Sequence, residues 1–159
     1  MRRKILLIDS DPIDAVRFRR ACDHVDLEGR LVVAADLQAA LRVLGGGDRF
    51  GAIVVYDDPG CWDLDRFAGH LAARLGRSCP PIIVLFDPEN SLSAQANATP
   101  HIAARLPRPR ESRAYDELAC TIRDFWMHPA GRRLARWAGA AARPACETDS
   151  WRTARSARA

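Results

Sequence analysis

Short apolar segments that recur at wide intervals constrain the fold of this chain more than any other feature of its sequence. Such segments occur at residues 4–8, 31–34, 52–56, 82–86 and, less strongly, 102–106. They are too short for helices, and most of their apolar side chains follow one another without polar residues between them. Continuous apolarity of this kind is typical of strands that are buried on both faces, as in a parallel sheet covered by helices.

Segments with helical spacing lie between the predicted strands. They are expected over residues 13–22, 37–44, 64–75 and from 111 to about 128. Asp36 and Asp63 precede the second and third helices and are suited to cap them, while Pro12 suits the first turn of the first. The polar segment 91–99 predicts one further helix, short or irregular. The apolar stripe of the last helix comprises Tyr115, Leu118, Ala119, Ile122, Phe125 and Trp126.

This alternation of strands and helices predicts an α/β fold, because right-handed crossover connections place helices on both faces of a parallel sheet. We expect a doubly wound, five-stranded parallel sheet. In such sheets ligands bind beyond the carboxyl ends of the strands, near the point where the strand order reverses. The residues expected at that edge are Asp9, Ser10, Asp11, Tyr56, Asp57, Asp58, Phe86, Asp87 and Arg108.

One domain is expected over residues 1–128, followed by an arginine- and alanine-rich extension over 129–159. The extension holds seven arginines and two acidic residues, whereas the formal net charge of the whole chain is +4 at pH 7. The domain itself is therefore close to neutral. Leu134 and Trp137 predict one amphipathic helix in the extension, followed by a disordered end. We expect the extension to bind a protein partner, and binding of nucleic acid through its arginines is the alternative.

The composition also narrows the class of protein. The five cysteines are scattered and contain no C-x-x-C pair, so neither a disulfide framework nor a zinc site is predicted. A basic start is followed by an apolar run that stops at Asp9, too short for a signal peptide or a membrane span. We therefore expect a cytoplasmic protein. No P-loop, G-x-S-x-G or G-x-G-x-x-G motif occurs, so the sequence does not predict an enzyme.

The chain resembles the receiver domain of the response regulators of bacterial two-component systems. Residues 5–12, Ile-Leu-Leu-Ile-Asp-Ser-Asp-Pro, are similar to the opening strand and acidic turn of that family. Residues 106–109, Leu-Pro-Arg-Pro, stand where the family has a lysine followed by proline. The resemblance covers about residues 3–128, and 124–126 are similar to the last helix of stand-alone receivers that accompany phytochrome-like histidine kinases. The resemblance implies a flavodoxin-like α/β fold whose five-stranded parallel sheet has the strand order 2-1-3-4-5. It also implies a stand-alone signalling protein of a phosphorelay.

The resemblance also implies that the phosphorylation site is altered. In the family an aspartate accepts a phosphoryl group from a kinase histidine, and Mg²⁺ stabilises the developing charge. Tyr56 stands at the acceptor position, and a phenol cannot form an acyl phosphate. Asp9 matches the acidic pair that binds the metal, but Ser10 follows it and is a poor ligand for a hard cation. Phe86 replaces the hydroxyl residue, and Arg108 replaces the lysine.

These changes predict a degenerate receiver, or pseudo-receiver, that acts by phosphorylation-independent protein binding without a cofactor. The expected partner is a histidine kinase or another receiver, and a homodimer through the fourth and fifth helices is a further expectation. The alternative is a phospho-accepting regulator that uses Asp57, with Mg²⁺ held by Asp9 and Asp11. This alternative requires a one-residue shift, which would turn the acceptor side chain to the opposite face of the sheet.

Overall fold

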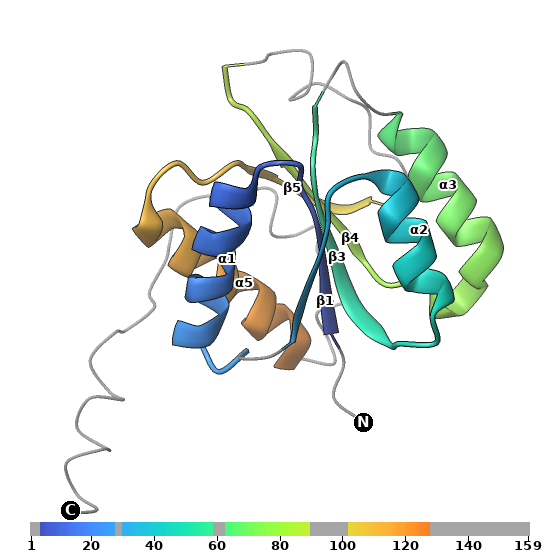
Figure 1. Ribbon diagram of the computed structural model, residues 1–159, viewed down its shortest axis with the longest axis horizontal. Helices are drawn as coiled ribbons and strands as arrows, with labels where there is room; N and C mark the ends of the chain where they lie inside the picture. The colour runs from blue at the N-terminus through green and yellow to red at the C-terminus, as the bar shows by residue number, and fades with distance from the viewer. Residues whose placement is uncertain (1–3, 28–29, 59–62, 90–101, 128–159) are drawn as a thin grey trace, which may run out of the picture.

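A five-stranded parallel sheet forms the centre of the computed structural model, which describes residues 4–27, 30–58, 63–89 and 102–127. Its strands are β1 (Lys4–Ile8), β2 (Leu31–Ala34), β3 (Phe50–Tyr56), β4 (Ile82–Phe86) and β5 (Ile102–Pro107). Their order is β2-β1-β3-β4-β5 (Figure 1), which confirms the predicted topology. The described helices are α1 (Pro12–His24), α2 (Leu37–Gly45), α3 (Leu64–Leu75), the short η1 (Gly76–Ser78) and α5 (Ser112–Met127).

Two layers of helices cover the sheet. Figure 1 shows α1 and α5 on one face and α2 and α3 on the other. Because side chains alternate between faces along a strand, Leu7 of β1 packs in the core under α1 and α5, whereas Leu6 packs in the core under α2 and α3. Both side chains are buried. The continuous apolarity of the short segments therefore has the predicted cause.

The helix ends follow the expected capping chemistry. Asp36 accepts a hydrogen bond from the Ala39 backbone N–H at 2.6 Å, and Asp63 accepts one from Arg66 at 2.9 Å. Both predicted caps are confirmed. Asp11 caps α1 in the same way, because its Oδ1 accepts from the Ile13 N–H at 2.8 Å. In the acidic turn after β1, Asp11 therefore caps the amino end of α1.

The last helix buries the predicted stripe where its side chains are described, namely Tyr115, Leu118, Ala119 and Ile122. The side chains of Phe125 and Trp126, the predicted segment 91–99 and the extension 129–159 lie outside the described residues.

The described cysteines differ in state. Cys22 and Cys79 are free thiols, and burial raises the pKa of Cys22 to about 12. Cys120 is disulfide-bonded, which the scattered spacing of the cysteines did not predict. Within the part of the chain that the structure describes, none of the helices has the length and apolar character needed to span a membrane.

Candidate functional site

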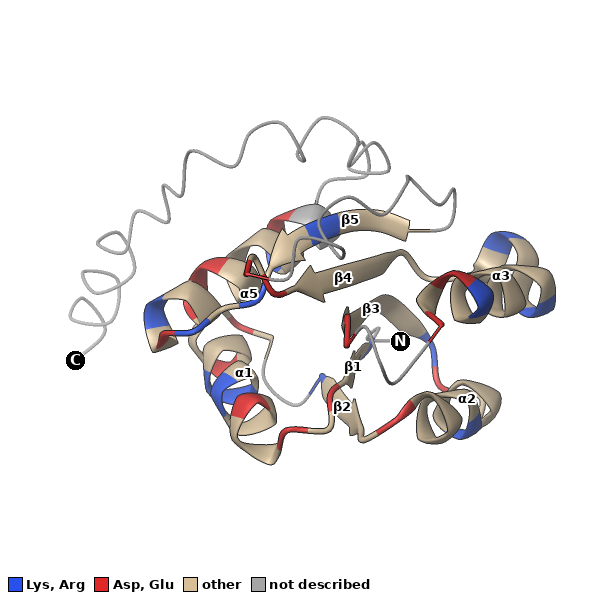
Figure 2. Ribbon diagram, turned by 90° about the horizontal axis from the view of Figure 1, so that it is seen from above, with Lys and Arg blue, Asp and Glu red and all other residues tan. Residues whose placement is uncertain are grey.

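The strand register brings the candidate residues to one edge of the sheet. Ile8, the last residue of β1, pairs with Val55 of β3, and Phe86 of β4 pairs with Pro107 of β5. Asp9, Tyr56 and Arg108 therefore lie at the carboxyl ends of their strands. Arg108 is fixed at this edge by its backbone, because its N–H donates to the Phe86 carbonyl at 2.7 Å. Figure 2, seen from above, shows basic segments between β5 and α5 beside acidic segments of α1.

The guanidinium of Arg108 binds an aspartate that the sequence analysis did not select. Its Nε donates to Asp14 Oδ2 at 2.9 Å, and its Nη2 makes a close ion pair with the same oxygen. Arg108 Nη2 also lies 3.9 Å from Asp9 Oδ2 and 3.9 Å from Asp11 Oδ2. The contact joins the segment after β5 to α1 and to the turn after β1.

Tyr56 covers one face of this guanidinium. Arg108 Cζ lies 3.8 Å from the centroid of the Tyr56 ring, within the range of a cation–π interaction. The ring packs against the core cluster under α1 and α5. The carboxyl end of β3 therefore places an aromatic face against a cation.

The ionisable groups of the site are shifted by burial and by each other. Burial raises the pKa of Asp9, and the Asp11 N–H, which donates to Asp9 Oδ1 at 2.9 Å, opposes this shift together with Arg108. Burial by itself would lower the pKa of Arg108, but hydrogen bonds to Asp14 and Tyr56 and the charges of Asp14 and Asp9 raise it overall. The guanidinium therefore stays charged.

Tyr115 of α5 completes the surroundings of Asp14. Burial raises the pKa of the Tyr115 phenol, and its hydrogen bond to Asp14 raises it further. The phenol thus remains protonated beside the Asp14 carboxylate. Arg17 of α1 also contacts Asp14, at 3.3 Å between Nη1 and Oδ1. Asp14 consequently interacts with groups from α1, α5 and the segment after β5.

Asp57 engages a different arginine. Its Oδ2 accepts a hydrogen bond from Arg105 Nη1 at 3.2 Å, and both side chains are largely buried. Arg105 lies between Ala104 and Leu106, which both pack under α1 and α5, so strand alternation directs Arg105 to the other face of the sheet. Asp57 follows Tyr56 directly and turns to that same face.

The remaining predicted positions surround the cluster of Arg108, Asp14 and Tyr56 at the carboxyl edge of the sheet. Ser10 is exposed, and Phe86 is half-buried at the end of β4. The neighbouring Asp87 is held by two hydrogen bonds at 3.1 Å each, from the Glu89 backbone N–H and from Arg110, and both lower the pKa of Asp87. Arg110 also pairs with Glu89 at 3.0 Å. These contacts tie the segment after β4 to the segment after β5.

The residues present do not fit a magnesium ion. Within the described ranges, no group of three or more His, Cys, Asp or Glu side chains is arranged to hold a metal. Asp9 Oδ1 and Asp11 Oδ1 accept backbone hydrogen bonds, and Asp14 Oδ2 accepts from Arg108. Tyr56 brings no carboxylate, although carboxylate and carbonyl oxygens are the ligands that Mg²⁺ takes in proteins.

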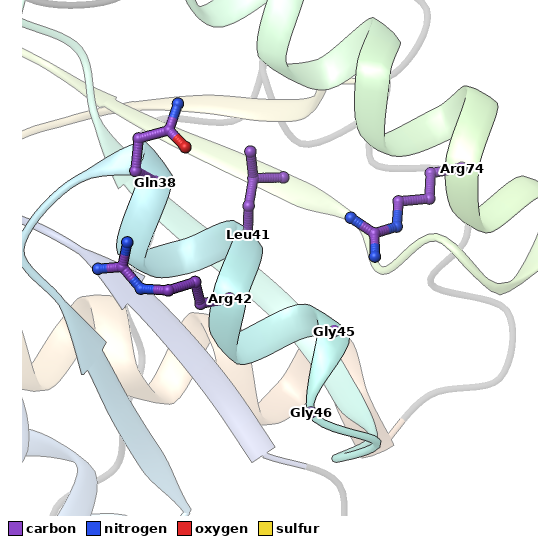
Figure 3. A pocket seen from close by; sticks show the side chains of 6 residues that line it. All are labelled: Gln38, Leu41, Arg42, Gly45, Gly46 and Arg74. Atoms are coloured by element: carbon purple, nitrogen blue, oxygen red, sulfur yellow. The ribbon is translucent and has the colours of Figure 1, made fainter.

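A second candidate, an open hollow of about 500 Å³, lies between α2 and α3. It is lined by Gln38, Leu41, Arg42, Gly45, Gly46 and Arg74. Figure 3 shows the Arg74 side chain pointing towards α2, while Arg42 extends on the other side of that helix. Their guanidinium groups do not converge on one ligand. Both arginines belong to the last turns of their helices, where positive charge complements the helix dipole.

Comparisons with known proteins agree with the observed topology. No family profile matches the sequence, and no curated protein matches it. Among solved structures, the phosphorylated cyanobacterial phytochrome response regulator RcpA superimposes with a TM-score of 0.64 at 15% identity, covering 80% of this chain and 95% of that one.

Two further solved structures extend this likeness. The chemotaxis response regulator CheY4 of Vibrio cholerae has a TM-score of 0.60 at 16% identity, covering 77% of this chain and 99% of that one. The signal receiver domain of an HD domain-containing protein from Pseudomonas fluorescens has a TM-score of 0.58 at 22% identity, covering 76% and 93%. At these identities the likeness shows that the chain has the fold of receiver domains.

Proposed function

Given this receiver fold, we propose that the chain is a two-component signalling protein that acts by phosphorylation-independent protein binding. The observation that carries the proposal is the stacking of Arg108 on Tyr56, at 3.8 Å from the ring centroid, where the family has its acceptor aspartate. A phenol offers no carboxylate for an acyl phosphate. The guanidinium covers the ring face and is held by Asp14. These contacts favour a surface of fixed shape that binds another protein, and they do not favour phosphoryl transfer.

The alternative acceptor, Asp57, is less well supported by its surroundings. Its carboxylate is paired with Arg105 at 3.2 Å. Strand alternation directs it away from Arg108 and from the Asp9 carboxylate. Phosphoryl transfer needs a cation that neutralises the developing charge beside the acceptor, and the cation paired with Asp57 is Arg105, which lies on the face of the sheet opposite to Arg108 and Asp9.

The proposed partner is a histidine kinase or a second receiver in the cytoplasm, with a homodimer as the other arrangement. The binding face includes α5, as the sequence predicts. The first half of α1 adds apolar contact area, because the residues Ile13 and Val16 are 61% and 49% exposed. Side chains three positions apart in a helix are neighbours on its surface, and contiguous exposed apolar area is typical of surfaces that bind other proteins.

Incubation with acetyl phosphate and Mg²⁺, followed by intact mass spectrometry, tests the proposal. The wild-type chain is expected to gain no stoichiometric acid-labile phosphate. The matched positive control restores the receiver residues through Ser10→Asp, Tyr56→Asp, Phe86→Thr and Arg108→Lys. Stoichiometric phosphate on the wild type would contradict the proposal, and its loss in Asp57→Asn would establish the alternative acceptor.

A further inference from the structure

Three carboxylates gather around one guanidinium at the carboxyl edge of the sheet. Arg108 pairs with Asp14 and lies 3.9 Å from both the Asp9 and the Asp11 carboxylates. Asp9 and Asp14 are each only 7% exposed, so water screens their repulsion weakly. A cation between the carboxylates is therefore needed to hold these negative charges together.

The shape of the site favours a guanidinium over a divalent ion. The ring of Tyr56 covers one face of the cation, and an aromatic face attracts a planar, weakly hydrated guanidinium. Mg²⁺ instead demands an octahedral set of oxygen ligands and usually keeps several of its water molecules. Ser10, which is exposed, supplies no charge to replace the second carboxylate of the receiver family.

We propose that the guanidinium of Arg108 takes the place of the divalent cation, so that the site keeps one arrangement at any Mg²⁺ concentration. This inference rests on the proposed function, because both assign the site a fixed arrangement. It goes beyond that function by naming the group that replaces the metal. The segment after β5 is thereby fastened to α1 through Asp14 and to β3 through Tyr56.

Calorimetric titration and thermal unfolding of the full chain, in the wild type and in Arg108→Ala, test the inference. The wild type is expected to bind neither Mn²⁺ nor Mg²⁺ at millimolar concentration, and its Tm should not respond to them. Arg108→Ala should lower Tm by roughly 5–10 °C, because it leaves buried carboxylates without their cation. Millimolar Mn²⁺ or added guanidinium should restore part of that loss, while sodium chloride of equal ionic strength should not.

Arg110→Ala is the matched control. Arg110 is two positions away, its side chain is 59% exposed, and it pairs with Asp87 and Glu89 at the surface. The Tm of the Arg110→Ala variant should lie no more than about 2 °C below that of the wild type, and it should not respond to Mn²⁺ or guanidinium. Arg108→Gln, a variant closer in size to arginine, is judged by the same criteria if Arg108→Ala does not fold.

Three results would overturn the inference. The first is millimolar Mn²⁺ binding by the wild type that disappears in Asp9→Asn. The second is an Arg108 variant as stable as the wild type, and the third is a loss of stability that neither cation reduces. Phosphate labelling is measured separately, so labelling of the wild type would refute the proposed function, while these results refute the replacement of the metal by Arg108.

Discussion

Two arginines near the end of β5 reach opposite faces of the sheet and meet different aspartates. Arg108 pairs with Asp14 under the ring of Tyr56, on the face covered by α1 and α5. Arg105 pairs with Asp57 on the other face. The difference shows that strand alternation decides which acidic side chain can join the cluster around Arg108. It also explains how an aspartate next to the acceptor position can belong to another set of contacts.

Neutralising the aspartate of each pair should lower the free energy of unfolding by different amounts on the two faces of the sheet. Asp14→Asn should lower the free energy of unfolding by about 2–4 kcal/mol, because the Asp14 side chain is 10% exposed and its loss leaves a partly buried guanidinium without its main partner. Asp57→Asn should cost less, about 1–2 kcal/mol, because Arg105 contacts Asp57 through Nη1 at 3.2 Å, whereas both Nε and Nη2 of Arg108 contact Asp14. Urea denaturation at neutral pH measures both. Equal losses, or a larger loss for Asp57→Asn, would show that the pair of Arg108 with Asp14 contributes no more to stability than the pair of Arg105 with Asp57.

The contribution of the Tyr56 ring can be separated from that of its hydroxyl group. Tyr56→Leu should lower the free energy of unfolding by about 1–2 kcal/mol, because it removes the ring face that Arg108 contacts. Tyr56→Phe keeps the ring and should cost only about 0.5 kcal/mol, from the lost interaction of the hydroxyl with Arg108. Both are read from urea unfolding. Similar losses for both variants would show that the hydroxyl, and not the ring face, stabilises the guanidinium.

A double-mutant cycle measures the interaction of Asp57 with Arg105 directly. Combining Asp57→Asn with Arg105→Gln should reveal a coupling free energy of about 1 kcal/mol, because the two side chains are 13% and 17% exposed and their contact is 3.2 Å long. Free energies of unfolding of the wild type, both single variants and the double variant give the coupling. Exposed Lys4 and Asp48, paired at 2.7 Å, form the control pair and should show weaker coupling despite the shorter contact.

The strands and helix caps could be predicted because their signals are local. Apolar runs report burial on both faces, and Asp36 and Asp63 cap the helices that they immediately precede. The edge of the sheet that carries Asp9 and Arg108 also followed from the sequence, because parallel strands end at the same edge.

Asp14 could not be identified as readily, because one carboxylate within a helix is usually exposed. A signal was present: Asp14 shares helical spacing with Phe18, Ala21 and Cys22, which are the other buried residues of α1. Its partner Arg108 is far along the chain, and only the packing of α1 beside the end of β5 brings the two together. The pairing of Arg105 with Asp57 depends in the same way on strand order.

The smallest expected effect concerns Asp9, which lies within reach of Arg108 without pairing with it as closely as Asp14 does. Burial raises the pKa of Asp9 in the folded chain, so its ionised form destabilises the fold relative to the unfolded chain at neutral pH. Asp9→Asn should therefore increase the free energy of unfolding, by up to about 1 kcal/mol. The gain should shrink as the pH falls through the raised pKa towards the ordinary value of an aspartate, because wild-type Asp9 then becomes protonated in the fold. Urea denaturation of the wild type and of Asp9→Asn at several pH values measures this gain. A loss of stability in Asp9→Asn at neutral pH would show that Arg108 needs the charge of Asp9 as well as that of Asp14.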